Sequence, residues 1–265
     1  MESRKSYLYA DLTWPEVREA VKAQRVVVLP VGTVEQHGPH LPLDTDNLLV
    51  QSVCEEAARR APEDALLMPV VSYGFNWHHI DFPGTIGIDA TNLMNYLLDI
   101  TRSVAYHGFR KILVVSGHGS NTALCDLVAR RTVMETEAIC ASFMYGALGR
   151  DTVSEVVQSQ VSHACEWETS LYLHVAPGRV QMDKAVKDIQ SIPSKFMYRG
   201  ILRPSPVSLM EWWSSFSDTG TVGDPTLASA EKGQRVFDAT VEQMVLLIKE
   251  FRTRPIRPRV DHHQG

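Results

Sequence analysis

Short apolar runs alternate along this chain with longer stretches of helical character. Arg25–Val31 and Lys111–Ser116 are short, rich in β-branched residues and largely apolar, which is typical of strands buried on both faces of a sheet. Ala65–Val71 and Ala138–Tyr145 are further strand-like runs. We therefore expect a strand at each of these four places.

Helix-like stretches separate the expected strands and follow the last of them. They are Trp14–Ala23, Asp46–Arg60, Thr91–His107, Asn121–Glu135 and a final run from about Leu227 to Phe251. Strands that alternate with helices form βαβ units, in which consecutive strands lie parallel. The pattern predicts an α/β fold with a largely parallel sheet flanked by helices.

The length and the course of the pattern favour one domain over 1–265. The chain has 265 residues, of which 44% are hydrophobic and 22% charged, enough for one sizeable α/β core. Between residues 182 and 225 the pattern becomes irregular and includes the pair Trp212–Trp213. A long irregular segment is usually functional, so we expect it to line the substrate site or an interface, and we expect 252–265 to be a tail.

Charge and composition exclude several classes of function. The formal net charge is −5 and the isoelectric point is near 6.1, so nucleic-acid binding is not expected, because the one basic cluster, Arg252–Arg259, is short. We find no secretory leader and no membrane span, and we expect a cytoplasmic protein. The cysteines form no CxxC pair, which argues against a disulfide framework or a structural zinc site; they are Cys54, Cys125, Cys140 and Cys165.

The first candidate for chemistry follows the first buried strand. Glu35, His37, His40, Asp44 and Asp46 come within twelve residues of one another, just where the chain leaves the sheet. In open α/β sheets, ligands bind at the carboxyl ends of the strands. Carboxylate and imidazole together suit zinc, manganese or iron better than calcium or magnesium, so this segment is a candidate metal site.

A second candidate follows the strand Lys111–Ser116. His118 lies between two glycines, Gly117 and Gly119, which allow the backbone to pass close to a ligand. The same residues also fit the start of a helix with Ser120 as its cap. Both interpretations can hold together. If His118 is a ligand, it lies at the same sheet edge as the cluster that begins with Glu35.

The third candidate is the helix-like stretch that begins after His163. There Glu168 shares a face with Leu171 and Tyr172 but not with Glu166. A carboxylate on an apolar face needs a partner, because an unpaired buried charge is costly, and a metal ion would be one. His163 is then a candidate for proton transfer, although a single histidine is more often simply hydrogen-bonded.

Charge counting favours two metal ions over one. Glu35, Asp46 and Glu168 carry three negative charges, while His37 and His118 carry none, so two divalent ions and one hydroxide would give a neutral centre. Asp46 can bridge the two ions. A pair of ions about 3.5–4 Å apart can share and deprotonate a water and polarise a carbonyl oxygen, which indicates hydrolysis of an amide-like or ketonic carbonyl.

Five blocks of this sequence, taken in order, resemble the creatininase (creatinine amidohydrolase) family. They are EQHGPHLPLDTD (Glu35–Asp46), DFPGT (Asp81–Thr85), SGHGSN (Ser116–Asn121), HACEWETS (His163–Ser170) and GDPTLASAEKG (Gly223–Gly233). The resemblance implies a three-layer α/β/α sandwich with a mostly parallel central sheet and a binuclear metal centre, usually in a homohexamer. It also implies that a metal-bound hydroxide opens cyclic amides and related substrates.

The resemblance assigns roles position by position. The metal-binding places fall on Glu35, His37, Asp46, His118 and Glu168, with Asp46 as the bridge, and the catalytic histidine place falls on His163. His40 and Asp44 would support these ligands. The substrate side would include Trp77, His78, His79, Gly119, Ser120 and Trp212.

Two departures bear on the substrate. Creatininase itself carries a tyrosine and a glutamate where this chain has Gly119 and Ser120, which argues against creatinine. Cys165 replaces a glycine that is frequent in relatives, and we expect a packed thiol there. The leading hypothesis is ring opening of a small cyclic amide, ketone or diketone, such as an oxidised inositol. Alternatives are an amidohydrolase or deformylase for a formamidopyrimidine-type or peptide substrate, a non-catalytic metal-binding protein, and a metal-independent aldolase or lyase.

Overall fold

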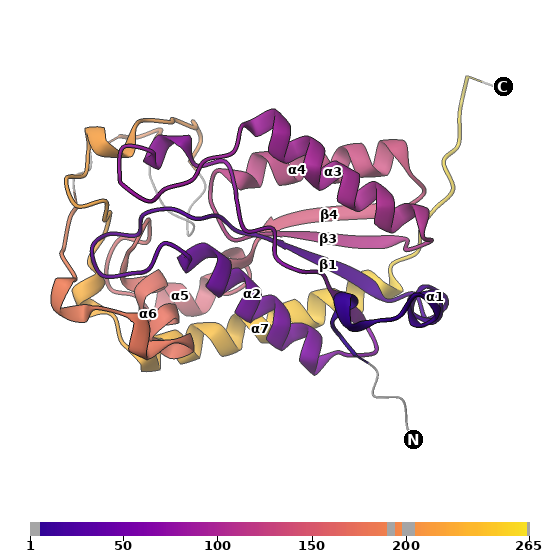
Figure 1. Cartoon of the computed structure of the whole chain (residues 1–265), viewed down its shortest axis with the longest axis horizontal. Helices are drawn as coiled ribbons and strands as arrows, with labels where there is room; N and C mark the ends of the chain where they lie inside the picture. The colour runs from indigo at the N-terminus through magenta and orange to yellow at the C-terminus, as the bar shows by residue number, and fades with distance from the viewer. Residues whose placement is uncertain (1–5, 190–193, 198–204, 264–265) are drawn as a thin grey trace.

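The computed structural model describes residues 6–189, 194–197 and 205–263 and is built on a four-stranded parallel sheet (Figure 1). The strand order is β2-β1-β3-β4. In chain order the strands are β1 (Val26–Val31), β2 (Ala65–Leu67), β3 (Lys111–Ser116) and β4 (Ile139–Met144). The pairing runs from Val27 with Ile112 to Val31 with Ser116, so β1 and β3 end side by side.

Helices cover both faces of the sheet. On one face lie α2 (Thr45–Arg60), α5 (Arg150–Val156), α6 (Glu166–Val175) and α7 (Ala230–Thr253). On the other lie α1 (Trp14–Lys22), α3 (Ala90–Tyr106) and α4 (Asn121–Glu135). Because successive strand residues face opposite sides, Val26 and Val28 join the first core and Val27 joins the second. The predicted three-layer α/β/α architecture is confirmed.

Two of the predicted boundaries are wrong. The second strand ends at Leu67 instead of Val71, since Pro69 cannot donate a ladder hydrogen bond; Val71 makes only an isolated bridge with Val31. The last helix begins at Ala230 instead of Leu227, because a short 3-10 turn, Pro225–Leu227, precedes it, and it continues to Thr253.

The irregular segment lies at the end of the molecule where the strands finish (Figure 1, left). Between residues 182 and 225, the described part contains 3-10 turns at Met182–Lys184 and Trp213–Ser215 and single bridges of Asp188 with Gly223 and His163 with Val222. Residues 190–193 and 198–204 of the predicted segment lie outside the described ranges. Within those ranges, no helix has the length and apolar character needed to cross a bilayer.

Candidate metal centre

Five predicted ligands converge beyond the ends of β1 and β3. Glu35 and His37 follow β1, Asp46 lies in the first turn of α2, His118 follows β3, and Glu168 lies in the first turn of α6. The pairing of β1 with β3 brings the two loops to one edge of the sheet. All five residues are buried, none exposing more than 6% of its surface, so the cluster combines three acids and two imidazoles inside the protein.

Asp46 lies between the two imidazoles. Its Oδ1 is 3.3 Å from His37 Nε2, and its Oδ2 is 3.2 Å from His118 Nδ1. Glu35 Oε1 is also 3.2 Å from His118 Nδ1. A carboxylate with one oxygen toward each imidazole has the geometry of a bridging ligand.

Two sets of ligand atoms lie around this carboxylate. Glu35, Asp46 and His118 form one set, and His37, His163 and Glu168 form the other; within each set the ligand atoms lie within 4.8 Å of one another. A third group of the same kind, Glu35, His79 and His163, shares a residue with each of them. The first two sets therefore each have room for one small cation.

Several buried polar atoms of the cluster lack hydrogen bonds. Within the described part of the chain, no hydrogen bond reaches Glu35 Oε2, His118 Nε2 or Glu168 Oε2. Such atoms are rare in native proteins and costly to bury. Divalent cations would satisfy them, and mixed carboxylate and imidazole donors suit zinc or manganese, so the residues present fit a two-metal centre.

The pKa values reflect an excess of buried negative charge. Burial raises the pKa of Glu168 to about 7. Burial opposes the charged form of His37 as well, but Asp46 outweighs it and raises the pKa of His37 to about 9. Glu35 and Asp46 likewise raise the pKa of His118 to about 10 against burial. The cluster thus favours bound cations, whether protons or metal ions.

His163 lies against the cluster with a fixed orientation. Its Nε2 donates to the main-chain carbonyl of Gln36 at 2.8 Å, which leaves Nδ1 facing Glu35 Oε1 at 3.6 Å. Burial, together with His37, holds the pKa of His163 well below its usual value. A neutral imidazole with its free nitrogen toward the cluster can accept a proton or hold a cation. Ala164 after it has φ +49°, an uncommon backbone conformation that sets the entry into α6.

His79 and Trp213 cover the cluster on the side of the irregular segment. His79 Nε2 is 3.8 Å from Glu35 Oε1, and its Nδ1 accepts from the Gln36 side chain at 2.8 Å. The Trp213 ring stacks on His79 with centroids 4.4 Å apart and meets His163 edge-on at 4.9 Å. These rings form an aromatic wall, defined here as His79, Trp213 and Phe216, which packs on Trp213 at 4.8 Å.

Other residues predicted for the substrate side lie at different distances from the cluster. The His78 ring is 5.7 Å from that of His118, and its Nε2 is 3.4 Å from the Ser120 hydroxyl. Gly119 borders open space, since an added Cβ would meet nothing within 4 Å. Trp77 and Trp212 are about half exposed, and no ring contact joins them to the cluster within the described ranges.

The two predicted supporting residues also differ. His40 Nε2 is hydrogen-bonded to the Thr169 hydroxyl at 2.8 Å, next to Glu168. Asp44 is not brought to the cluster: it is partly exposed, accepts from the Tyr172 hydroxyl at 3.0 Å and pairs with Arg179 at 2.9 Å. It therefore ties α2 to α6 and reaches the ligands only through these helices.

Sequence reasoning missed Gln36, and of the pair Trp212–Trp213 it named Trp212 as the substrate contact. In extended backbone, Gln36 would point away from the side that Glu35 and His37 share, yet its buried amide joins His79 to the Gly220 carbonyl at 3.1 Å. Trp212 was the tryptophan predicted to touch substrate, but the 3-10 turn Trp213–Ser215 begins one residue later and presents Trp213 to the cluster. A tryptophan pair was the available signal, without information on which member turns inward.

Three relatives of known activity share most of their length with this chain. The mycofactocin precursor peptide peptidase of Mycolicibacterium smegmatis is 34% identical over 230 residues, with 85% of each chain covered. Creatinine amidohydrolase of Pseudomonas putida is 28% identical over 265 residues, covering 93% of this chain and 97% of the relative. The 3-dehydro-scyllo-inosose hydrolase of Thermotoga maritima is 24% identical over 273 residues, covering 96% and 86%.

Solved structures of creatininases have the same fold as this chain. A creatininase of the "Zn-Zn type" superposes with a TM-score of 0.77 at 28% identity, covering 92% of this chain and 98% of its own. One named "Creatininase Mn" has the same TM-score, identity and coverage. The family model for creatininase, described as creatinine amidohydrolase, matches residues 10–248. Since this match spans most of the chain, the protein belongs to the creatininase family of hydrolases.

Proposed function

We propose that this protein is a two-metal hydrolase that acts on a carbonyl centre of a compact substrate, with a cyclic amide or cyclic ketone as the leading class. The observation that carries the proposal is Asp46, which lies with one oxygen toward His37 and the other toward His118. Metal-containing forms of creatininase with zinc and manganese support divalent ions in these positions.

Glu35, Asp46 and His118 would hold one ion, and His37, Asp46 and Glu168 the other. Two divalent ions so placed supply Lewis acidity, which polarises a carbonyl oxygen and lowers the pKa of a water. The chain itself contributes the orientation of these ligands, because each comes from a strand end or from the first turn of a helix.

His163 would be the proton-transfer group. The Gln36 carbonyl fixes its Nε2 as a donor, so Nδ1 is the nitrogen that can take a proton from the attacking water and return it to the leaving group. Its low pKa keeps that nitrogen available near neutral pH. The aromatic wall would limit the access of water from the same side, which would strengthen electrostatic interactions within the site.

The surroundings of the cluster support a compact substrate. Trp213 lies within ring contact of both His79 and His163, leaving an approach suited to a compact group. A peptide amide is the second candidate, favoured by the open space at Gly119 and by the relative that is a peptide peptidase at 34% identity.

The test combines metal analysis with activity. Wild type and the variants Glu35→Ala and His118→Ala would be loaded with zinc or manganese and profiled against cyclic amides, formamides, short peptides and inosose-type diketones. We expect about two ions per chain and turnover of one class in wild type, with both lost or reduced in the variants. His107→Ala, an exposed histidine after α3, is the matched control.

Unchanged metal content and turnover in both variants would refute the two-metal mechanism. Tight metal binding by wild type without turnover of any class would instead favour the non-catalytic binding protein. Full activity after exhaustive chelation would favour a metal-independent reaction.

A further inference from the structure

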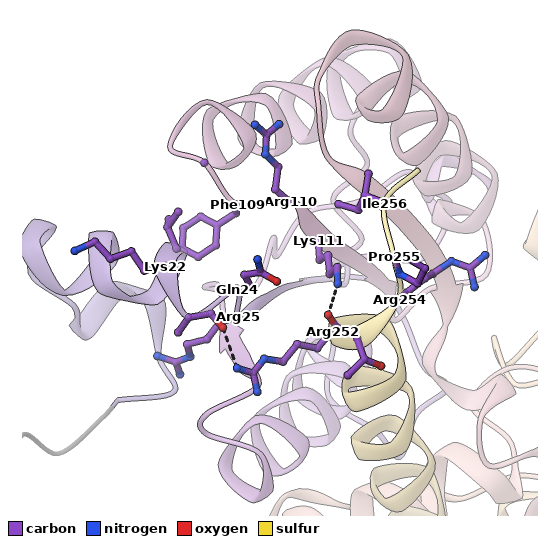
Figure 2. Close-up of a pocket in the computed structure, with 14 residues that line it drawn as sticks. Lys22, Gln24, Arg25, Phe109, Arg110, Lys111, Arg252, Arg254, Pro255 and Ile256 are labelled. Atoms are coloured by element: carbon purple, nitrogen blue, oxygen red, sulfur yellow. Dashed lines mark hydrogen bonds between the residues drawn. The ribbon is translucent and has the colours of Figure 1, made fainter. Parts of the chain in front are cut away.

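A cavity lies at the opposite edge of the sheet from the metal cluster, where β1 and β3 begin (Figure 2). Its volume is about 770 Å³, within the range of about 300–1,000 Å³ typical of small-molecule sites. The end of α1, the turn before β3 and the residues after α7 line it. The six cationic residues of this lining are Lys22, Arg25, Arg110, Lys111, Arg252 and Arg254.

The floor of this cavity is cationic without a matching set of acids. The Lys111 ammonium is buried and donates to the main-chain carbonyl of Arg252, as Figure 2 shows. Arg25 donates to the carbonyls of Ala65 and Ser6. These partners are main-chain carbonyl groups, which are neutral. They orient the cations but do not cancel their charge.

The lining has no carboxylate, and few lie nearby. Arg252 pairs with Asp64, and on the rim Lys22 pairs with exposed Glu19 at 2.8 Å. Arg110 reaches Glu137 only at 3.9 Å. In the described part of the chain, no ion pair involves Arg25, Lys111 or Arg254. In a protein whose net charge is −5, this is a local excess of positive charge.

Burial lowers the pKa of Lys111, and the neighbouring Arg252 lowers it further. On Arg25, burial is the largest effect and lowers the pKa, Glu63 and Asp64 oppose it, and Arg252 adds to it. A bound anion would relieve both, since an opposite charge favours the charged form of each group. In the described part of the chain the lining therefore holds more cations than ion-pair partners, since Arg25, Lys111 and Arg254 make no ion pair.

The lining also has an apolar part. Val21, Phe109, Pro255 and Ile256 border the cavity beside the cations. Arginine binds phosphate through two parallel hydrogen bonds, and lysine binds it as a point charge. Cations next to an apolar wall fit a ligand with an anionic end and an organic body.

We propose that this cavity binds a small organic phosphate of about nucleotide size. The site is separate from the metal cluster by the length of β1, which at about 3.3 Å per residue amounts to roughly 20 Å. The proposal does not rest on the function of that cluster. It gives a role to the basic sequence after residue 252, which composition alone assigns to a tail.

Binding of ATP, without added divalent ions and at low ionic strength, tests the proposal by calorimetry. The double variant Arg110→Gln with Arg254→Gln removes two exposed charges of the lining without touching the buried Lys111. We expect wild type to bind one ATP per chain and the double variant to bind at least about tenfold more weakly. Arg130→Gln, which removes an exposed charge on α4 outside the cavity, should bind like wild type.

Glu35→Gln separates this site from the metal cluster, because it should bind ATP like wild type. Loss of binding in Glu35→Gln, equal binding in the double variant, or no binding to wild type at millimolar ATP would each overturn the proposal. Pyrophosphate serves as the second probe. Affinity equal to that of ATP would overturn the assignment to an organic phosphate, whereas weaker binding would support a contribution from the apolar wall.

Discussion

At the carboxyl edge of the sheet, carboxylates and imidazoles lie buried against one another, whereas at the amino edge the cationic groups lie beside main-chain carbonyls. Both edges concentrate charge, but of the two only the first leaves buried side-chain atoms of the described residues, such as Glu35 Oε2, without hydrogen bonds. At the second, the carbonyls of Ala65 and Arg252 accept from the cations. The buried acids and imidazoles of the first edge need bound cations to satisfy their free atoms. The cations of the second edge already have carbonyl partners, and a ligand there would be an addition.

The largest expected effect belongs to Asp46→Ala. Because Asp46 contacts an imidazole from each ligand set, its loss should remove both metal ions and lower kcat/KM by about 10²–10³-fold or more. Glu168→Ala affects one set alone and should retain one ion. Plasma emission analysis with activity measures both. Equal metal content in the two variants would contradict the bridging role.

His163→Ala should leave the metals bound and lower kcat by about 10²–10⁴-fold, as expected for a general acid or base. His163 is hydrogen-bonded to Gln36, so a circular dichroism spectrum and metal content identical to wild type must accompany the loss. His40→Ala, which removes a hydrogen bond to Thr169 instead, is the comparison. An unaltered kcat in His163→Ala would remove it from the mechanism.

A smaller effect is expected at the aromatic wall. Trp213→Ala removes the ring stacked on His79, an interaction worth about 0.5–1.5 kcal/mol, and we expect kcat/KM to fall by roughly tenfold with the metals retained. Trp213→Phe should restore part of the rate. Trp212→Ala, at a half-exposed position, should have less effect. A larger loss of kcat/KM in Trp212→Ala than in Trp213→Ala, measured in steady-state assays, would show that Trp212 is the tryptophan that contacts the substrate.

The smallest effect concerns a carboxylate remote from both edges. Arg59 and Arg60 hold Glu56 at 2.7 Å, and these bonds lower its pKa to about 2. A carboxyl whose pKa is lower in the folded than in the unfolded protein stabilises the fold at pH values above its ordinary pKa of 4.5. This contribution is lost as the pH falls toward the folded-state pKa of about 2. Glu56→Gln should therefore cost below about 1 kcal/mol at pH 7, and urea unfolding should show the difference shrinking below pH 4.5 and vanishing near pH 2.

The convergence of the five predicted ligands could be expected from the sequence, because its members occupy places that local pattern defines. Glu35 and His118 directly follow buried strands, and Glu168 lies on the inward face of a helix. Strand order and parallel pairing then bring these places together with no further information. The α/β/α layers follow from the same alternation of strands and helices.

The aromatic wall could not be predicted in the same way. Trp213 reaches His79 only because the irregular segment folds back over the cluster, where Ser214 also binds Asp81. That course depends on contacts between segments more than a hundred residues apart, and no periodic pattern encodes it. The end of β2, in contrast, could have been predicted from the sequence. A single residue, Pro69, is enough to shorten this strand.

The Gly220 carbonyl has a consequence for protein engineering. It accepts from both the Gln36 amide at 3.1 Å and the Trp213 indole at 2.9 Å. Gly220 itself has φ +81°, and a Cβ there would lie 1.9 Å from Gln36 Oε1. Loop exchange that keeps this glycine could thus replace the residues around Trp213 and alter the accepted substrate, while the ligand loops that precede it in the chain stay unchanged.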